Sequence, residues 1–320
     1  MRFVYCLPFL LALAACRTRQ PVAALPPPAR TEIRDAALIP EGIAVNPANG
    51  AVYVSSLHRR KVVQVRADGW LQELFPSGSN GFEMGLGMKV SADGKTLWIC
   101  SAAPSGSGPT GLFRYDLGAR RIAARYTHDS ALFLNDVVLH PDGSVFVTDT
   151  YRGAVFRLPP GGSALELWSR EPALSLANGI ALSADGRFLF VASGDNGIQR
   201  VDIRTRSVES VSRGTRTDYA VDGLLAYGNG LIGVIGWPHD APQQHRVIRY
   251  ALTSDGYLDR ATILRAADSL LQMPTTAAVR GGELLVLART NVALFNRHNQ
   301  DLERVFDSLQ RSIILRLPLQ

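Results

Sequence analysis

The chain has 320 residues, of which 46% are hydrophobic and 19% charged, and this composition excludes an intrinsically disordered protein and a coiled coil. The formal charge of +6 comes mainly from arginine, since only three of the 34 basic residues are lysine. These basic residues are scattered and form no basic run, so nucleic acid is not an expected partner. The length permits either two domains or one large β-architecture.

The first sixteen residues predict a lipoprotein signal. Arg2 precedes an uncharged segment, residues 3–15, which is too short to span a bilayer and matches the apolar part of a secretory signal peptide. The segment ends in Leu13-Ala14-Ala15-Cys16, and small residues before a cysteine resemble the bacterial lipobox, in which the cysteine becomes the lipidated first residue. We therefore expect a protein anchored to a membrane of the bacterial cell envelope, in our prediction the outer membrane, and facing the periplasm. An ordinary cleavage site followed by a coincidental cysteine is the alternative.

Residues 16–31 are predicted to be a semi-rigid tether, because they contain four prolines and no apolar pattern. Cysteine usage agrees with this organisation. Cys6 leaves with the signal peptide and Cys16 carries the lipid, so Cys100 has no partner for a disulfide and is expected to be a small core residue. The folded part, residues 32–320, must be stabilised by its own hydrophobic core.

A hairpin-like unit recurs six times along this folded part. Each unit has a short apolar run, a turn that contains glycine and a second apolar run, and two further strand-like runs follow. The turn glycines are Gly50, Gly94, Gly143, Gly186, Gly230 and Gly282. Four strands in a period of about 45 residues are typical of a propeller blade, so we predict an all-β, monomeric, six-bladed β-propeller with four antiparallel strands per blade. The segments 32–38 and 313–317 could each supply the last outer strand.

In a propeller, the first residue of each innermost strand lies at the same height around the central axis. Counting back from the turn glycines gives Glu41, Leu86, Asn135, Asn178, Asp222 and Pro274. Four of these six are carboxylates or carboxamides. Oxygen donors that include two carboxylates suit a hard divalent cation, although asparagine or aspartate before glycine is also common turn chemistry.

Four motifs carry a resemblance to a known family. They are Pro40-Glu-Gly, Leu134-Asn-Asp-Val-Val, Leu176-Ala-Asn-Gly-Ile-Ala-Leu-Ser-Ala-Asp-Gly and Val221-Asp-Gly-Leu. They resemble the senescence-marker-protein-30/gluconolactonase group, whose wider relatives are the six-bladed paraoxonases and diisopropylfluorophosphatases. The resemblance covers most of residues 38–290.

This resemblance implies one divalent cation, Ca²⁺ in the first place and Zn²⁺ or Mn²⁺ as alternatives, held by Glu41, Asn135, Asn178 and Asp222. It further implies hydrolysis of a small lactone or related ester, in which Asp222 orients or activates the attacking water. In some relatives the residue that matches Asn135 contacts the substrate instead. Gly42 stands where paraoxonases have an aspartate for a second calcium, so a second metal is not expected.

Substrate contacts are expected from the loops that follow the second strand of each blade. Two side chains in these loops stand out, Tyr151 and His239, and the resemblance to paraoxonases implies a histidine near the place of His239. Two other functions remain open. The first is a non-catalytic propeller that binds a ligand or a protein at the cell envelope, and the second is a strictosidine-synthase-like propeller with no metal requirement.

Overall fold

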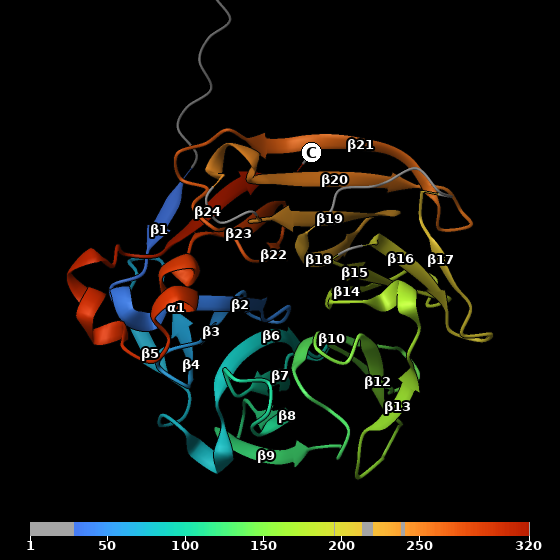
Figure 1. The fold of residues 1–320 in the computed structure, drawn as a ribbon, viewed down its shortest axis with the longest axis horizontal. Coiled ribbons are helices and arrows are strands. Elements are labelled where there is room, and N and C mark those ends of the chain that lie inside the picture. The colour runs from blue at the N-terminus through green and yellow to red at the C-terminus, as the bar shows by residue number, and fades with distance from the viewer. Residues whose placement is uncertain (1–28, 195, 213–219, 238–240, 320) are drawn as a thin grey trace, which may run out of the picture.

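Short strands joined by tight turns form six antiparallel sheets around a central axis (Figure 1). The computed structural model describes residues 29–194, 196–212, 220–237 and 241–319. Each sheet has four strands and is one blade of a six-bladed β-propeller, which confirms the predicted fold class. The turn glycines Gly50, Gly94, Gly143 and Gly186 all have positive φ angles, a conformation in which glycine carries no steric cost.

The first five blades follow one another along the chain. Blade 1 contains β2 (Pro40–Val45), β3 (Val52–Ser56), β4 (Val62–Val65) and β5 (Leu71–Glu73). Blade 2 contains β6 (Met84–Val90), β7 (Thr96–Ala102), β8 (Thr110–Asp116) and β9 (Arg121–Tyr126). Blade 3 contains β10 (Leu134–Leu139), β11 (Val145–Asp149), β12 (Ala154–Leu158) and β13 (Glu166–Ser169). Blade 4 contains β14 (Ala177–Leu182), β15 (Phe188–Ser193), β16 (Gly197–Asp202) and β17 (Val208–Ser210). Blade 5 contains β18 (Val221–Tyr227), β19 (Gly230–Ile235), β20 (Arg246–Leu252) and β21 (Leu258–Ala266).

Both ends of the chain contribute to blade 6. This blade contains β22 (Ala277–Arg280), β23 (Glu283–Arg289) and β24 (Ile313–Pro318), and β1 (Arg30–Glu32) pairs antiparallel with β24 as the outermost strand. The C-terminal candidate segment is thus the third strand rather than the last outer one, and the outermost strand lies mostly before the N-terminal candidate, since it shares only Glu32 with residues 32–38. The folded part begins at Arg30, slightly earlier than the boundary expected at residue 32.

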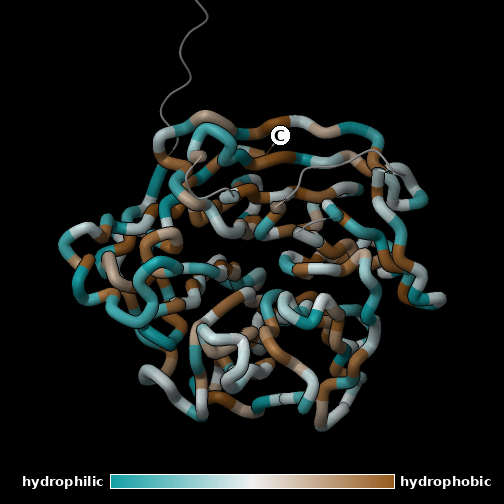
Figure 2. The backbone as a smooth tube through the Cα atoms, in the orientation of Figure 1, coloured by the Kyte–Doolittle hydropathy of each residue, from teal (hydrophilic) through white to brown (hydrophobic). Residues whose placement is uncertain are grey.

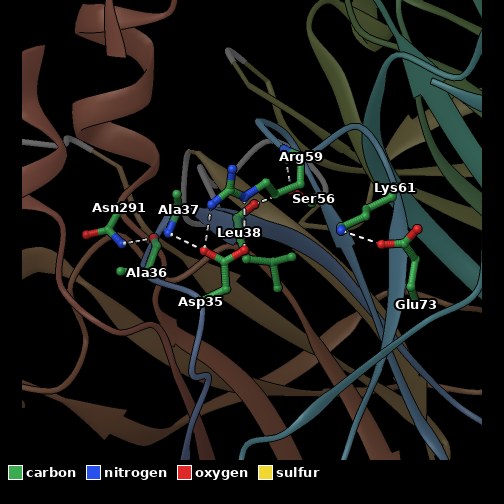
Figure 3. A network of polar contacts seen from close by, with 9 residues as sticks. All are labelled: Asp35, Ala36, Ala37, Leu38, Ser56, Arg59, Lys61, Glu73 and Asn291. Atoms are coloured by element: carbon green, nitrogen blue, oxygen red, sulfur yellow. Dashed lines mark hydrogen bonds and ion pairs between the residues drawn. The ribbon is translucent and has the colours of Figure 1, made fainter. Parts of the chain in front are cut away.

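A polar network fixes the N-terminal segment after β1 (Figure 3). The carboxylate of Asp35 caps η1 (Ala36–Leu38) by accepting a hydrogen bond from a backbone N–H, and it also accepts bonds from Nε and Nη2 of Arg59 at 2.9 and 3.1 Å. Asn291 donates from Nδ2 to the carbonyl of Ala36 at 3.2 Å. The closing segment is therefore attached both to blade 1 and to the chain that follows β23.

A helical insertion lies between β23 and β24 of blade 6. It contains α1 (Val292–His298) and η5 (Leu302–Ser308), and α1 is the only α-helix among the residues that the structure describes. Val292 and Phe295 are 6% and 5% exposed and pack in the same core cluster as Leu57 and Met84. Two helical turns leave no sustained periodicity in the sequence, which is why this insertion was not predicted.

The remaining helical segments are single turns: η2 (Ser79–Gly81), η3 (Pro172–Leu174) and η4 (Pro242–Gln244). None of the helices in the described part of the chain is long and apolar enough to cross a membrane. The core lies between adjacent blades, and Figure 2 shows hydrophobic residues along the strands. Cys100 is fully buried in this core, as expected.

Candidate metal centre and substrate cavity

A β-bulge interrupts the innermost strand at the same point in five blades. In blade 1 the pairing of β2 with β3 shifts between positions 40 and 43. The same shift occurs between positions 85 and 88, 134 and 137, 177 and 180, and 221 and 224. A bulge bends a strand and changes the direction of a side chain. The first bulged residues all line one cavity at the end of the axis where these strands begin: Glu41, Leu86, Asn135, Asn178 and Asp222.

Blade 6 contributes Thr275 to this ring, and the expectation of Pro274 was wrong. Thr275 lies two positions before Ala277, whose pairing with β23 matches that of Ile43 with β3, and it lines the cavity. Its Oγ1 donates to the carbonyl of Glu41 at 2.9 Å and so links blade 6 to blade 1. The error arose because Gly282 lies inside a two-residue turn, so that counting back from it is one position out.

Hydroxyl groups from the second strands hold neighbouring bulges together. Ser55 accepts a hydrogen bond from the bulge N–H of its own blade at 2.8 Å and donates to the carbonyl of Leu86 in the next blade at 2.8 Å. Thr148 does the same in blade 3, since it accepts a bulge N–H at 3.0 Å and donates to the carbonyl of Asn178 at 2.6 Å. The backbone of the ring is therefore cross-linked between blades, which preorganises the side chains that it carries.

The second bulged residue is glycine in four blades because the bulges touch one another. These residues are Gly42, Gly87, Gly179 and Gly223. A Cβ at Gly42 would lie only 2.1 Å from the carbonyl oxygen of Leu86. Blade 3 has Asp136 in the corresponding place, and its carboxylate accepts hydrogen bonds from the backbone N–H groups of Val137 at 2.8 Å and Ile180 at 3.1 Å.

Three carboxylates therefore lie close to one another, and their pKa values are raised. Burial raises the pKa of Glu41 well above its usual range, and the charges of Asp222 and Asp136 add to the effect. Burial raises the pKa of Asp222 to about 7 with a contribution from the Asp136 charge, although a hydrogen bond from Asn178 opposes the shift. Burial also raises the pKa of Asp136 to about 6, against the two backbone hydrogen bonds and the charge of Lys89. Each group is thus costly to ionise without a nearby cation.

The donor atoms suit such a cation. Oε2 of Glu41 is buried and has no hydrogen-bond partner, which is unusual for a carboxylate oxygen. Asn178 uses its NH₂ group to bond Asp222, and Asn135 donates from Nδ2 to Thr150 at 2.8 Å. Both carboxamides therefore keep a carbonyl oxygen for a ligand, and a set of oxygen donors with two carboxylates fits a hard divalent ion.

Histidine and cysteine do not take part in this set. In the described ranges, no three or more His, Cys, Asp or Glu side chains are grouped so that they could hold a metal ion. The oxygen-donor set is of a different kind, because two of its four side chains are carboxamides. Lys89 lies further along the axis, where it lines a second cavity of about 140 Å³ together with Asp136. Its side chain is exposed to this second cavity.

The ring forms the floor of a cavity of about 710 Å³, within the range of about 300–1,000 Å³ that is usual for small-molecule sites. Residues after the second strands line its sides, as expected, and they include Leu57, Thr150, Tyr151 and Trp237. Tyr151 is 53% exposed and packs against Phe133, with ring centroids 4.7 Å apart. His239, the other predicted substrate contact, lies outside the described residues.

Sequence reasoning missed three contributors to the site. Thr275 was displaced by one position, and the residues of the helical insertion that line the cavity, such as Phe295, carried no signal. Asp136 did carry one. Blades 1, 2, 4 and 5 have glycine after the ring residue, so aspartate in the same place of blade 3 marks a departure from the repeat that calls for a specific role.

Comparisons with known proteins place the chain in a family and relate its fold to solved structures. Over residues 39–267 the chain matches the family model of the SMP-30/Gluconolactonase/LRE-like region. Among solved structures, a gluconolactonase of Xanthomonas campestris is 20% identical, with a TM-score of 0.61 over 92% of this chain and 96% of that one. Regucalcin of Agrobacterium tumefaciens, a calcium-binding protein, is 19% identical, with a TM-score of 0.62 over 92% and 94%.

Virginiamycin B lyase of Staphylococcus aureus shares the fold at 16% identity, with a TM-score of 0.57 over 81% of each chain. No curated protein sequence matches the chain. The structural likenesses are too distant to show more than the fold, whereas the family model covers most of the propeller. The repeat, the oxygen-donor ring and this match lead to one conclusion: the chain belongs to the SMP-30/gluconolactonase/LRE-like family.

Proposed function

We propose that this protein is a divalent-metal-dependent hydrolase of a lactone or related ester. The observation that carries the proposal is Oε2 of Glu41, a buried carboxylate oxygen with no partner, next to the second carboxylate of Asp222. Two neighbouring buried carboxylates are stable as charged groups only when a cation is bound between them. Glu41, Asn178, Asp222 and Asn135 would hold the ion, with Ca²⁺ as the first choice and Zn²⁺ or Mn²⁺ as alternatives.

A bound divalent ion supplies Lewis-acid chemistry, which polarises a carbonyl and stabilises the oxyanion that forms on attack. Asp222 orients and activates the attacking water, and its hydrogen bond from Asn178 fixes the direction of its carboxylate. A carboxylate next to a cation has a lowered proton affinity, so Asp222 acts as a base only when it turns away from the ion. Asn135 and Tyr151, together with His239, contact the substrate in this proposal.

The similar proteins support the proposal at the level of the family. One of the solved structures is a gluconolactonase and another is a calcium-binding regucalcin, and both cover almost the whole propeller. A lactonase needs a carbonyl-activating group, a positioned water and a cavity of small-molecule size. The ring residues would hold the ion and orient the water, and the cavity of about 710 Å³ has the size of a small-molecule site.

Purified protein without the signal peptide is expected to contain close to one divalent ion and to open a simple lactone only when the ion is present. The measurement is metal content by elemental analysis together with lactone hydrolysis before and after treatment with a chelator. Ca²⁺, Mn²⁺ and Zn²⁺ are then added back separately. If the protein binds none of these ions after reconstitution, the hydrolase proposal fails and a ligand-binding propeller takes its place.

We also propose that the enzyme works as a monomer at the bacterial cell envelope, anchored through lipidated Cys16. The support is the sequence before the propeller, because Cys16 lies outside the described residues. Cells that express the full chain and are fed an alkyne-labelled fatty acid should incorporate the label into the protein and retain it in the outer-membrane fraction. Cys16→Ser should abolish labelling, whereas Cys100→Ser is the matched control. Labelling that persists in Cys16→Ser would contradict the anchor.

A further inference from the structure

A second set of residues stands two positions before the polar ring in each blade, at or just before the start of the innermost strand. We call it the apolar collar, and its members are Ile39, Met84, Phe133, Leu176, Ala220 and Met273. All six are apolar, whereas five of the six residues in the ring below are polar. All except Ile39 line the cavity. Five of them precede the first residue of the innermost strand, and the shared cavity shows that Met84, Phe133, Leu176, Ala220 and Met273 face the same space as the polar ring.

The backbone of the collar has an unusual conformation, although Ile39, Met84 and Met273 also pack in a core cluster. Ile39, Leu176, Ala220 and Met273 have φ angles of 48, 53, 57 and 56°, a left-handed conformation that residues with large side chains seldom adopt. Strain of this kind is found at sites where function requires it. Leu176 is also 44% exposed, so its position cannot be explained by burial in the core.

The segments that follow the second strands hold the collar in this conformation. The carbonyl of Ile39 accepts a hydrogen bond from the backbone N–H of Leu57 at 3.1 Å, and the carbonyl of Leu176 accepts one from Gly194 at 3.2 Å. Thr290 donates from Oγ1 to the carbonyl of Met273 at 2.6 Å. The collar is therefore a rigid part of the propeller.

The helical insertion extends the apolar surface on one side. Val292 and Phe295 of α1 line the cavity together with Leu57 and Met84, and Trp237, 53% exposed, lines it from blade 5. Among the described side chains that line this cavity, Glu41 and Asp222 on the floor are the only charged ones. The site thus combines a polar floor, where the carbonyl reacts, with a wall that is mainly apolar and also contains Thr150, Asn296 and Asn299.

We propose that the apolar collar binds an alkyl or aryl group of the substrate, so that the enzyme prefers lactones or esters with an apolar substituent over polyhydroxylated sugar lactones. This inference rests on the proposed hydrolase function. A sugar lactone would place several hydroxyl groups against the collar, where they lose their water and find few partners. An alkyl chain instead gains from each methylene that leaves water.

The test compares δ-valerolactone, δ-heptalactone, δ-nonalactone, δ-undecalactone and δ-gluconolactone as substrates of the metal-loaded enzyme. We expect kcat/KM to rise by about fourfold for each added methylene until the collar is filled, and δ-gluconolactone to be a poorer substrate than δ-nonalactone. The proposal would be overturned if kcat/KM did not change with alkyl length, or if δ-gluconolactone were the best substrate. Either result would leave the hydrolase function intact.

Leu176→Asn tests the collar directly. Asparagine tolerates the left-handed conformation, so the variant is expected to fold as well as the wild type while it loses apolar surface. The preference for δ-undecalactone over δ-valerolactone should fall by about fivefold. Leu167→Asn is the matched control, because Leu167 is 41% exposed but lies on β13, the outermost strand of blade 3, and it should keep the wild-type preference. An unchanged preference in Leu176→Asn counts against the collar.

Binding of the matching δ-lactams, which resist hydrolysis, separates this inference from the proposed function. Calorimetry should show affinity that rises with alkyl length in the wild type and rises less in Leu176→Asn. If no lactone is opened with any metal, the hydrolase function fails, and the lactam series alone then decides the collar. Lactam affinity that does not depend on alkyl length would refute the collar.

Discussion

Asp222→Asn is expected to lower kcat/KM for lactone hydrolysis by at least about a hundredfold and to abolish the stoichiometric divalent ion. Asp222 is one of the two carboxylates in the oxygen-donor ring, so the change removes half of the anionic charge that holds the ion. It also replaces the group that orients the attacking water. Metal content and kcat/KM are measured on the same preparation.

Asp222→Asn is expected to lower activity but not the stability of the metal-free protein. Asp222 is partly buried near Asp136 and its pKa is raised to about 7, so a neutral amide removes repulsion. The unfolding temperature of metal-free Asp222→Asn should therefore equal or exceed that of the metal-free wild type, a trade between stability and function that active sites often show.

Asp129→Asn provides the control for Asp222→Asn, because Asp129 is an exposed carboxylate outside the cavity. This variant should keep the metal, the activity and the unfolding temperature. If Asp222→Asn instead retains one tightly bound ion and wild-type activity, the ring described above is not the metal centre.

The metal-free protein is expected to become less stable as the pH rises, the reverse of ordinary acid denaturation. Burial raises the pKa of Asp222 to about 7 and that of Asp136 to about 6, both from 3.8. The folded state therefore retains protons that the unfolded chain has already released, and the free energy of unfolding falls with pH across this interval. Each unit of pKa shift corresponds to about 1.4 kcal/mol, so the unfolding temperature should be clearly lower at about pH 8 than at about pH 5.

A divalent ion should cancel this loss. It binds the ionised carboxylates, so Ca²⁺ at about a hundred times its dissociation constant should stabilise the protein by about 2.7 kcal/mol at high pH and by much less at low pH. Thermal unfolding at several pH values with and without Ca²⁺ measures both effects, and the calcium effect should vanish in Glu41→Gln. A metal-free protein whose unfolding temperature rises between these pH values would show that the carboxylates are not repelling one another.

Much of the architecture could be predicted because a propeller repeats one local pattern. Asp-Gly and Asn-Gly turns between short apolar runs depend on neighbouring residues alone, and their spacing gave six blades of four strands. Positional equivalence then placed Glu41, Asn135, Asn178 and Asp222 around one axis. The ring was wrong only in blade 6, where a shorter turn moved Thr275 into the place expected for Pro274.

Features that depend on contacts between blades were not predictable in the same way. Asp136 is visible in the sequence as a single substitution at a position where other blades have glycine. Its contacts are not visible there, because its carboxylate accepts hydrogen bonds from backbone N–H groups of two different blades. The insertion with α1 is too short for its periodicity to be recognised, and it acquires its place by packing Phe295 against a core built from other blades.

The sequence by itself determined the number of blades, the oxygen donors of the candidate metal site and, as predictions, the signal peptide and the tether, because each of these depends on local patterns. Only the tertiary structure decided that β1 closes blade 6, that burial raises the pKa values of three neighbouring carboxylates, and that an apolar collar stands next to the polar ring. These properties arise where residues far apart in the chain meet. The burial and the electrostatic environment of a side chain depend on those long-range contacts, so they cannot be predicted from any single segment of the sequence.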